Sequence, residues 1–291
     1  MKINKYQEII NEKELNGLFN EPIDTFGFKE KNIRKVNENH KFWKNKWYSK
    51  IYSFFMRAIL KFASFFIKIW FLNQIKGKNN YKKLKNQNFI AVSNHCLYLD
   101  NLLIRDNINK HKFFILAKED NNVKGTRGRM LQHGGMFPIP SNPRALIKMK
   151  QELKVLLESK KRNFILIFAE KEMWHKYIKP RPTVNGAYNF AYDFNKPILP
   201  VFLEIKKYKN SDRVKRVVTH FLEPIYPNNN LDKSENIEMM KNNLEKQWID
   251  KYYEIFKISK NQNLYKINSQ GFERLNEHPE FQKQCNEIQV N

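Results

Sequence analysis

The chain has 291 residues and a net charge of +24, with 14% aromatic residues and only two cysteines. This length and aromatic content exclude a disordered chain and allow one large domain with an appendage. Two cysteines exclude a disulfide framework, and their spacing predicts no metal site. The charge favours polyanions such as membrane phosphates. Because no nucleic-acid-binding signature is visible, we expect no nucleic acid partner.

Residues 1–45 are polar and mixed in charge, and predict a short helix followed by an extended arm. No chemistry is apparent in them. The first residues lack the apolar stretch of a signal peptide, so we expect a cytoplasmic protein.

The stretch Ile51–Leu72 is mostly apolar and predicts a helix of about 33 Å. Its polar residues recur at helical spacing and fall on one stripe about 80° wide. A helix lying in the bilayer interface sinks its aromatic face and leaves the basic residues against lipid phosphates. A helix in the protein core is an alternative, and so is a span, which carries three basic residues through hydrocarbon at about 2.5–3.5 kcal/mol each. The stripe comprises Ser53, Arg57, Lys61, Ser64 and Lys68.

A predicted strand, Phe89 to Val92, leads through a turn to His95, and Asp100 lies five residues further on. An imidazole can take up and return a proton near neutral pH, and a carboxylate on its other nitrogen fixes the tautomer. This is the orienting half of a Ser-His-Asp triad, with the substrate supplying the hydroxyl. Cys96 beside His95 raises a thiol-nucleophile alternative, which we rank low because adjacent side chains point apart.

Strands and helices alternate through the rest of the chain, which predicts a layered α/β domain. A polar remainder follows the last helix and predicts a tail with little fixed structure. We expect strands at 112–118, 163–170, 197–204 and 213–225, and helices at 102–108, 142–159, 185–194 and 237–258.

Four ordered blocks resemble the glycerolipid acyltransferase superfamily, whose bacterial members acylate lysophosphatidic acid. A strand delivers Asn94-His95 and Asp100, which match the family's Asn-His-x4-Asp, and the resemblance covers about residues 85–226. It implies an α/β/α domain with a mixed central sheet, with His95 as general base and Asp100 orienting it. The other three blocks are the Gly-rich turn 134–137, the strand end 168–170 and the Pro-Ile-x-Pro-Val strand 197–201.

The chain departs from the family in the third block, where Lys171-Glu172-Met173 stands in place of Gly-Thr-Arg. The resemblance implies that basic residues hold the acceptor's phosphate. Lys171, Lys179 and Arg181 are candidates from the same loop. Arg144 is a further candidate because it begins a predicted helix, capped by Asn142, whose N-terminus favours anions.

Each of these binding residues has an alternative reading. Glu170 organises the acceptor pocket or is a strand-end carboxylate paired with a nearby lysine. Arg144 is otherwise a solvated residue at a helix start. Lys179 and Arg181 are otherwise parts of a rigid exposed turn, because prolines alternate with them.

We therefore expect an acyltransferase that moves a fatty acyl group from acyl-CoA or acyl carrier protein to a lysophospholipid hydroxyl, most simply that of 1-acylglycerol-3-phosphate. No cofactor and no metal are expected. A glycolipid or other lysolipid acceptor is an alternative, and so is a non-catalytic basic protein on a membrane. The predicted domains are a membrane-associating N-terminal segment (1–77), the acyltransferase domain (78–260) and a polar tail (261–291), with the protein peripheral or monotopic on the cytoplasmic face of the membrane.

Overall fold

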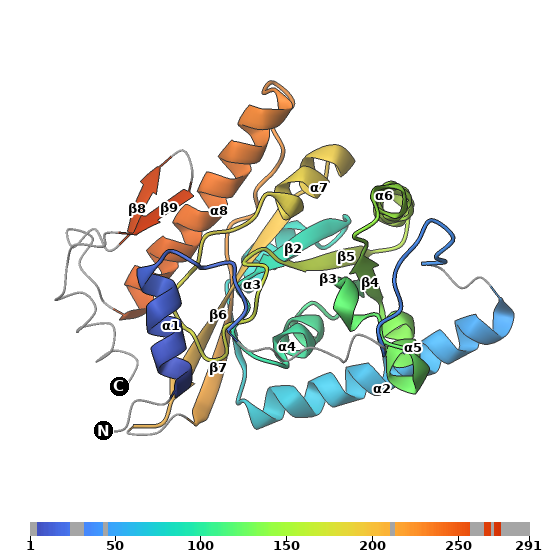
Figure 1. Cartoon of the computed structure of the whole chain (residues 1–291), viewed down its shortest axis with the longest axis horizontal. Helices are drawn as coiled ribbons and strands as arrows, with labels where there is room; N and C mark the ends of the chain where they lie inside the picture. Colours follow the sequence, from blue (N-terminus) through green and yellow to red (C-terminus); the bar gives the residue numbers. More distant parts are fainter. Residues whose placement is uncertain are drawn as a thin grey trace.

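The computed structural model describes residues 5–23, 32–42, 46–209, 213–256, 265–268 and 271–274 (Figure 1). A seven-stranded sheet forms its centre, in the order β1-β7-β6-β2-β5-β3-β4. All neighbouring strands are parallel except β6 and β7, so the predicted mixed sheet is confirmed. The strands are β1 (Gln74–Lys76), β2 (Phe89–Ser93), β3 (Lys112–Lys118), β4 (Met136–Ile139), β5 (Asn163–Phe168), β6 (Ile198–Lys207) and β7 (Val214–Phe221).

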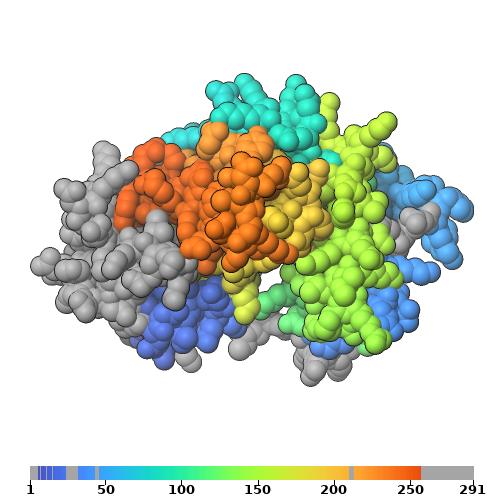
Figure 2. Space-filling model, turned by 90° about the horizontal axis from the view of Figure 1, so that it is seen from above, coloured from blue at the N-terminus to red at the C-terminus, as the bar shows by residue number. Residues whose placement is uncertain are grey.

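Helices cover both faces of the sheet, which confirms the α/β/α layering (Figure 1). Helices α6, α7 and α8 lie on one face, where Figure 2 shows α8 in orange, α7 in yellow and α6 in yellow-green. Helices α2, α4 and α5 lie on the other. The helices are α1 (Lys5–Leu15), α2 (Trp47–Trp70), α3 (Lys78–Lys83), α4 (Asp100–Asn107), α5 (Gly125–Gly134), α6 (Pro143–Glu158), α7 (Gly186–Phe194) and α8 (Lys233–Phe256), with a short 3₁₀ turn, η2 (Glu119–Asn121).

Strand β2 lies at the middle of the sheet between β5 and β6, and all five of its residues are buried. A parallel strand covered on both faces reads as a continuous apolar run, which is why the sequence identified β2 and β5 so clearly. The carboxyl ends of such strands share one edge of the sheet, and open α/β sheets place their ligand sites there. β2 therefore delivers the residues that follow it to that edge.

Two features near the end of the chain differ in detail from the sequence prediction. The expected last strand of the sheet, 213–225, ends at Phe221 as β7, and beyond it only an isolated bridge joins Ile225 to Ile198. Within the expected tail, β8 (Tyr265–Asn268) pairs with β9 (Gly271–Arg274) as an antiparallel hairpin; the other residues of that tail lie outside the described part of the chain. The predicted domain boundary after residue 77 lies directly after β1 in the sequence. Because β1 is an edge strand of the central sheet, the segment before the boundary contributes to that sheet.

The polar stripe of helix α2 faces the protein. The sequence analysis placed this face against lipid phosphates. Ser53 Oγ lies 2.6 Å from His133 Nδ1 of α5, and Lys68 forms an ion pair of 2.9 Å with Asp106 of α4. Lys61 is the exposed member of the polar stripe. The predicted contacts of Arg57 and Lys68 with lipid phosphates are therefore wrong, because these side chains hold the helix to the domain.

The opposite face of α2 is apolar and exposed. Trp47, Phe54, Phe62 and Trp70 are 67–82% exposed, and seven further large apolar side chains of the helix are also exposed. Within the described residues, none of the helices combines the length and apolar character needed to cross a bilayer. Soluble proteins rarely expose so large an apolar patch without a partner surface.

Arg105 is buried and Arg57 is partly buried between α2, α4 and β3, and neither has a carboxylate partner in the described part of the chain. Arg57 Nη1 donates to the Phe113 carbonyl at 2.8 Å, and its guanidinium lies over the Phe114 ring. Arg105 Nη2 donates to the Arg57 carbonyl at 3.0 Å. Burial, with the nearby Arg105 charge, lowers the pKa of Arg57 to about 10.

Candidate active site

The turn after β2 is fixed by the Asn94 side chain. Its Oδ1 accepts from the Leu203 amide at 2.8 Å and its Nδ2 donates to the Leu203 carbonyl at 3.1 Å. The amide thus imitates a backbone pairing with β6 beyond the point where β2 ends. This contact holds the next residue, His95, at the carboxyl edge of the sheet.

The structure brings His95 and Asp100 together. His95 Nδ1 lies 2.7 Å from Asp100 Oδ2, and the Asp100 side chain is 1% exposed. Asp100 opens helix α4, whose N-terminus favours a negative charge. Because an ionised carboxylate only accepts, Nδ1 carries the proton, and Nε2 keeps a lone pair for an incoming hydroxyl.

Phe168 packs against the imidazole, with ring centroids 3.9 Å apart and planes 10° from parallel. It is the last residue of β5, and the sequence analysis did not single it out. The His95 side chain retains 22% of its exposure. A ring held on one face by Phe168 and at Nδ1 by Asp100 has one edge available to a substrate.

Glu170 is buried and has both carboxylate oxygens occupied. Oε2 accepts from the His95 amide at 3.0 Å and from Arg181 Nη2 at 2.8 Å, and Oε1 accepts from the Arg181 amide at 2.9 Å. The predicted lysine partner is therefore an arginine. The carboxylate holds the backbone of His95 in place and is not directed to a substrate.

The predicted phosphate-binding pair Lys179 and Arg181 is buried, not exposed on a rigid turn. Lys179 Nζ forms an ion pair of 2.8 Å with Glu14 of α1. Arg181 is fully buried, and donates to the Phe19 carbonyl at 2.8 Å in addition to Glu170. Because carboxylates and carbonyls already occupy both cations, the structure does not present them to an acceptor phosphate.

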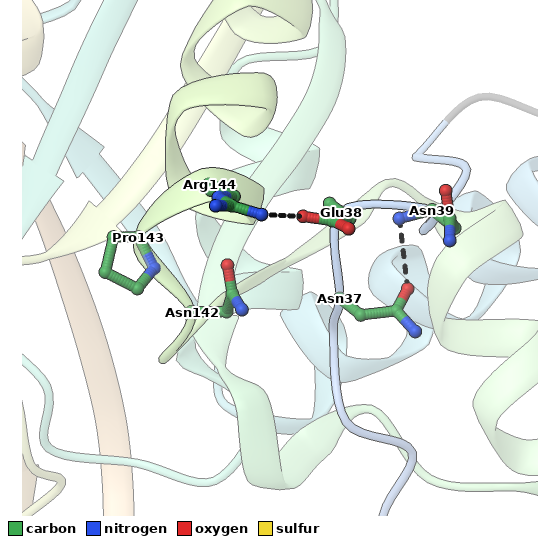
Figure 3. Close-up of a pocket in the computed structure, with 6 residues that line it drawn as sticks. All are labelled: Asn37, Glu38, Asn39, Asn142, Pro143 and Arg144. Carbon is green, nitrogen blue, oxygen red and sulfur yellow. Dashed lines mark hydrogen bonds and ion pairs between the residues drawn. The ribbon is translucent and has the colours of Figure 1, made fainter.

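Arg144 lies apart, at the start of helix α6 (Figure 3). It is exposed and forms an ion pair of 3.5 Å with Glu38, in a hollow that Asn142 also lines. Asn142 caps the helix by accepting from the Ala145 amide at 3.1 Å, as predicted. The structure thus shows the solvated helix-start arrangement of Arg144 and does not bring it to His95 through any contact.

Lys171 occupies the position of the family glycine after Glu170 and has a φ of +68°, in the left-handed region that favours glycine. The backbone of this loop therefore keeps a glycine-like turn although the side chain differs. Lys171 is also exposed. The neighbouring Glu172 forms an ion pair with Lys118 at the end of β3.

Cys96 is buried beside the site, and burial raises the pKa of its thiol well above the usual value. The thiolate is the nucleophilic form, so this environment disfavours the thiol alternative. Among the described residues, no group of three His, Cys, Asp or Glu side chains is arranged to hold a metal ion.

Residues 74–204 match the acyltransferase family model. This match supports the glycerolipid acyltransferase superfamily that the sequence blocks resemble. Its fold is similar to that of the 1-acyl-sn-glycerophosphate (LPA) acyltransferase PlsC from Thermotoga maritima, with a TM-score of 0.53 and 19% sequence identity over 73% of this chain and 88% of that one. No curated protein sequence gives a significant match. The family match supports an acyltransferase, while the structural likeness at this identity shows the fold alone.

Proposed function

We propose that the enzyme transfers a fatty acyl group from the thioester of acyl-CoA or acyl carrier protein to the hydroxyl of a lysophospholipid. The observation that carries this proposal is the His95–Asp100 contact of 2.7 Å at the carboxyl edge of the sheet. His95 Nε2 takes the hydroxyl proton as the oxygen attacks the thioester carbonyl. The tetrahedral intermediate then expels the thiolate, which receives the proton from the imidazolium.

The acceptor we propose first is 1-acylglycerol-3-phosphate. Lys171, which directly follows Glu170 in the sequence, is the cation that we propose binds the acceptor's phosphate. Lys171 is exposed and its side chain has no hydrogen bond or ion pair within the described residues, whereas the side chains of Lys179 and Arg181 are paired with carboxylates. A glycolipid or a lysolipid without a phosphomonoester is the alternative acceptor, because the buried pairs remove two of the predicted phosphate ligands.

We propose further that the exposed face of α2 docks on the cytoplasmic surface of a membrane as a peripheral or monotopic contact. An apolar, aromatic-rich helix face suits the boundary between headgroups and acyl chains. The acceptor and the transferred acyl group both partition into that boundary. A site on a domain that is bound there receives both without exposing their chains to water.

The deciding experiment measures free CoA released from acyl-CoA by the purified protein with a panel of lysolipids. Release that requires a lysolipid supports the enzyme, and its absence with every acceptor, with acyl-CoA or acyl carrier protein as donor, favours a non-catalytic membrane protein. The His95→Ala variant is expected to lose about 10²–10⁴-fold in kcat while remaining folded, because a positioned base contributes that much. Cys96→Ser is the matched control and is expected to remain active.

A further inference from the structure

Residues 5–23, here called the N-terminal strap, pack on the loop formed by residues 171–182. The strap comprises α1 and the turns after it (Figure 1). Ile10, Phe19 and Ile23 of the strap form a small apolar core with Trp174 and Tyr177 of the loop, and each of the five is at most 8% exposed. This core is separate from the main core of the domain.

Polar contacts reinforce this packing at buried positions. Trp174 Nε1 donates to the Glu21 carbonyl at 2.9 Å. Lys179 and Glu14 form their ion pair with each side chain at most 8% exposed. A buried ion pair is costly to separate, because either charge alone is desolvated without a partner. The strap is therefore an integral part of the loop's structure.

The same loop holds the backbone on both sides of the catalytic dyad's histidine. The Trp174 amide donates to the His95 carbonyl at 3.2 Å, and the Lys176 amide donates to the Cys96 carbonyl at 2.7 Å. Glu170 accepts from the His95 amide at 3.0 Å. Both backbone hydrogen-bonding groups of His95 are thus bound by residues that follow β5.

Arg181 joins the strap to this arrangement. Its Nη1 donates to the Phe19 carbonyl of the strap, and its Nη2 donates to Glu170 and to the Glu172 carbonyl. A continuous path of hydrogen bonds therefore runs from Phe19 through Arg181 and Glu170 to the amide of His95. The planar fork of a guanidinium can bind these partners at once, which an ammonium cannot reproduce.

We propose that the N-terminal strap and Arg181 position His95, so that the catalytic base is aligned only when the strap is bound to the loop. This inference rests on the proposed acyl transfer and assigns positioning roles, not catalytic ones, to Arg181 and Trp174. A displacement of a base by 1 Å can cost about 10²-fold in rate. The site of this chain is consequently incomplete without residues 5–23, a segment in which the sequence shows no chemistry.

The Trp174→Phe variant tests the path with little disturbance, because it keeps the aromatic contact and removes the hydrogen bond to the strap. We expect kcat to fall about 10-fold while KM for both substrates and the melting temperature stay near those of the wild type. Lys13→Gln is the control, since it breaks an ion pair with Glu21 within the strap, and the Lys13 side chain forms no hydrogen bond or ion pair with the loop among the described residues. An acceptor KM that rises at constant kcat would overturn the proposal, as would a kcat that stays constant or increases.

Amide hydrogen exchange gives a readout that does not need activity. In the Arg181→Lys variant we expect the segment 93–97 to exchange about 10-fold faster, because Glu170 loses the fork that holds it against the His95 amide. Unchanged exchange there would overturn the coupling. If the wild type transfers no acyl group to any acceptor but the variant shows faster exchange, the proposed function fails and the positioning path stands.

Discussion

Two pairs of inward-facing cations in this molecule are held in opposite ways. In the 171–182 loop, Arg181 and Lys179 are neutralised by the carboxylates of Glu170 and Glu14. Under helix α2, Arg57 and Arg105 donate hydrogen bonds to backbone carbonyl oxygens and contact aromatic rings. Arg105 lies over the Phe113 ring. The first pair belongs to the candidate active site, and the second fastens the helix to the domain.

In a chain of net charge +24, a regular or motif-like placement of basic residues does not by itself identify a phosphate-binding site. The spacing of the stripe placed Arg57 against lipid phosphates, and the family resemblance implied a phosphate ligand for Lys179 and Arg181. The structure directs all three side chains inward. A desolvated cation needs partners, and the partners can be carboxylates or dipoles and ring faces. The two cases predict different consequences when a cation is removed.

The largest expected effect concerns the exposed face of α2. Replacing Phe55, Phe62 and Phe66 together by Ser should weaken binding to neutral phosphatidylcholine vesicles by more than about 100-fold, at about 1.5–3 kcal/mol for each fully buried Phe. Vesicle flotation at several lipid concentrations measures this. Lys68→Gln is the control and should change the binding little, because Lys68 is paired with Asp106. Equal loss in both variants would mean that the cations of α2 face the lipid.

The next effect is on the free energy of unfolding. Arg181→Met should lower it by about 3–5 kcal/mol, because Glu170 then remains buried without its charged partner. Urea denaturation followed by circular dichroism measures the loss. The double variant with Glu170→Gln should lose less than the sum of the two single changes. Arg144→Met, which breaks an exposed ion pair, should cost at most about 1 kcal/mol and serves as the control.

Arg57→Met should be milder than Arg181→Met, at about 1–2 kcal/mol. It removes one hydrogen bond to a carbonyl and one ring contact, and leaves no carboxylate uncompensated within the described residues. The same urea titration compares the two variants directly. A loss as large as that of Arg181→Met would remove the distinction between the two kinds of buried cation.

The sequence identified the layered fold and the His95–Asp100 contact because both are local. Buried parallel strands leave continuous apolar runs, and five residues separate the two members of the dyad. The order of the family blocks supplied the rest of the topology. The mixed sheet is confirmed and the family match supports the superfamily, whereas the catalytic roles of His95 and Asp100 stay predictions.

The contacts that the sequence could not supply join segments far apart in the chain. Arg181 meets Phe19 across 162 positions and Lys179 meets Glu14 across 165. No sequence periodicity links residues that far apart. The sequence around Lys179 and Arg181 was therefore equally consistent with an exposed turn and with a ligand site. The stripe on α2 had a related ambiguity, because amphipathicity separates two faces without telling which one meets the protein.

The smallest expected effect tests the like charges that gather beside Arg57. Burial and the charges of Arg57 and Lys161 lower the pKa of Lys112 to about 8. A lysine whose pKa is lower in the folded state carries a penalty below that pKa, and the penalty disappears as the pH rises toward the unfolded value of about 10.4. Since Lys112 still contacts solvent, water screens the repulsion and the effect is modest.

Lys112→Gln should therefore stabilise the fold by a few tenths of a kcal/mol at pH 7. The advantage over the wild type should shrink between pH 8 and about 10.4, because the folded wild type loses the Lys112 proton there while its unfolded chain keeps it. Added salt should reduce the gain at pH 7. Lys160→Gln is the control, being exposed and not among the charges that act on Lys112. A destabilised Lys112→Gln variant at pH 7 would show that the cations beneath α2 attract a partner in place of repelling one another.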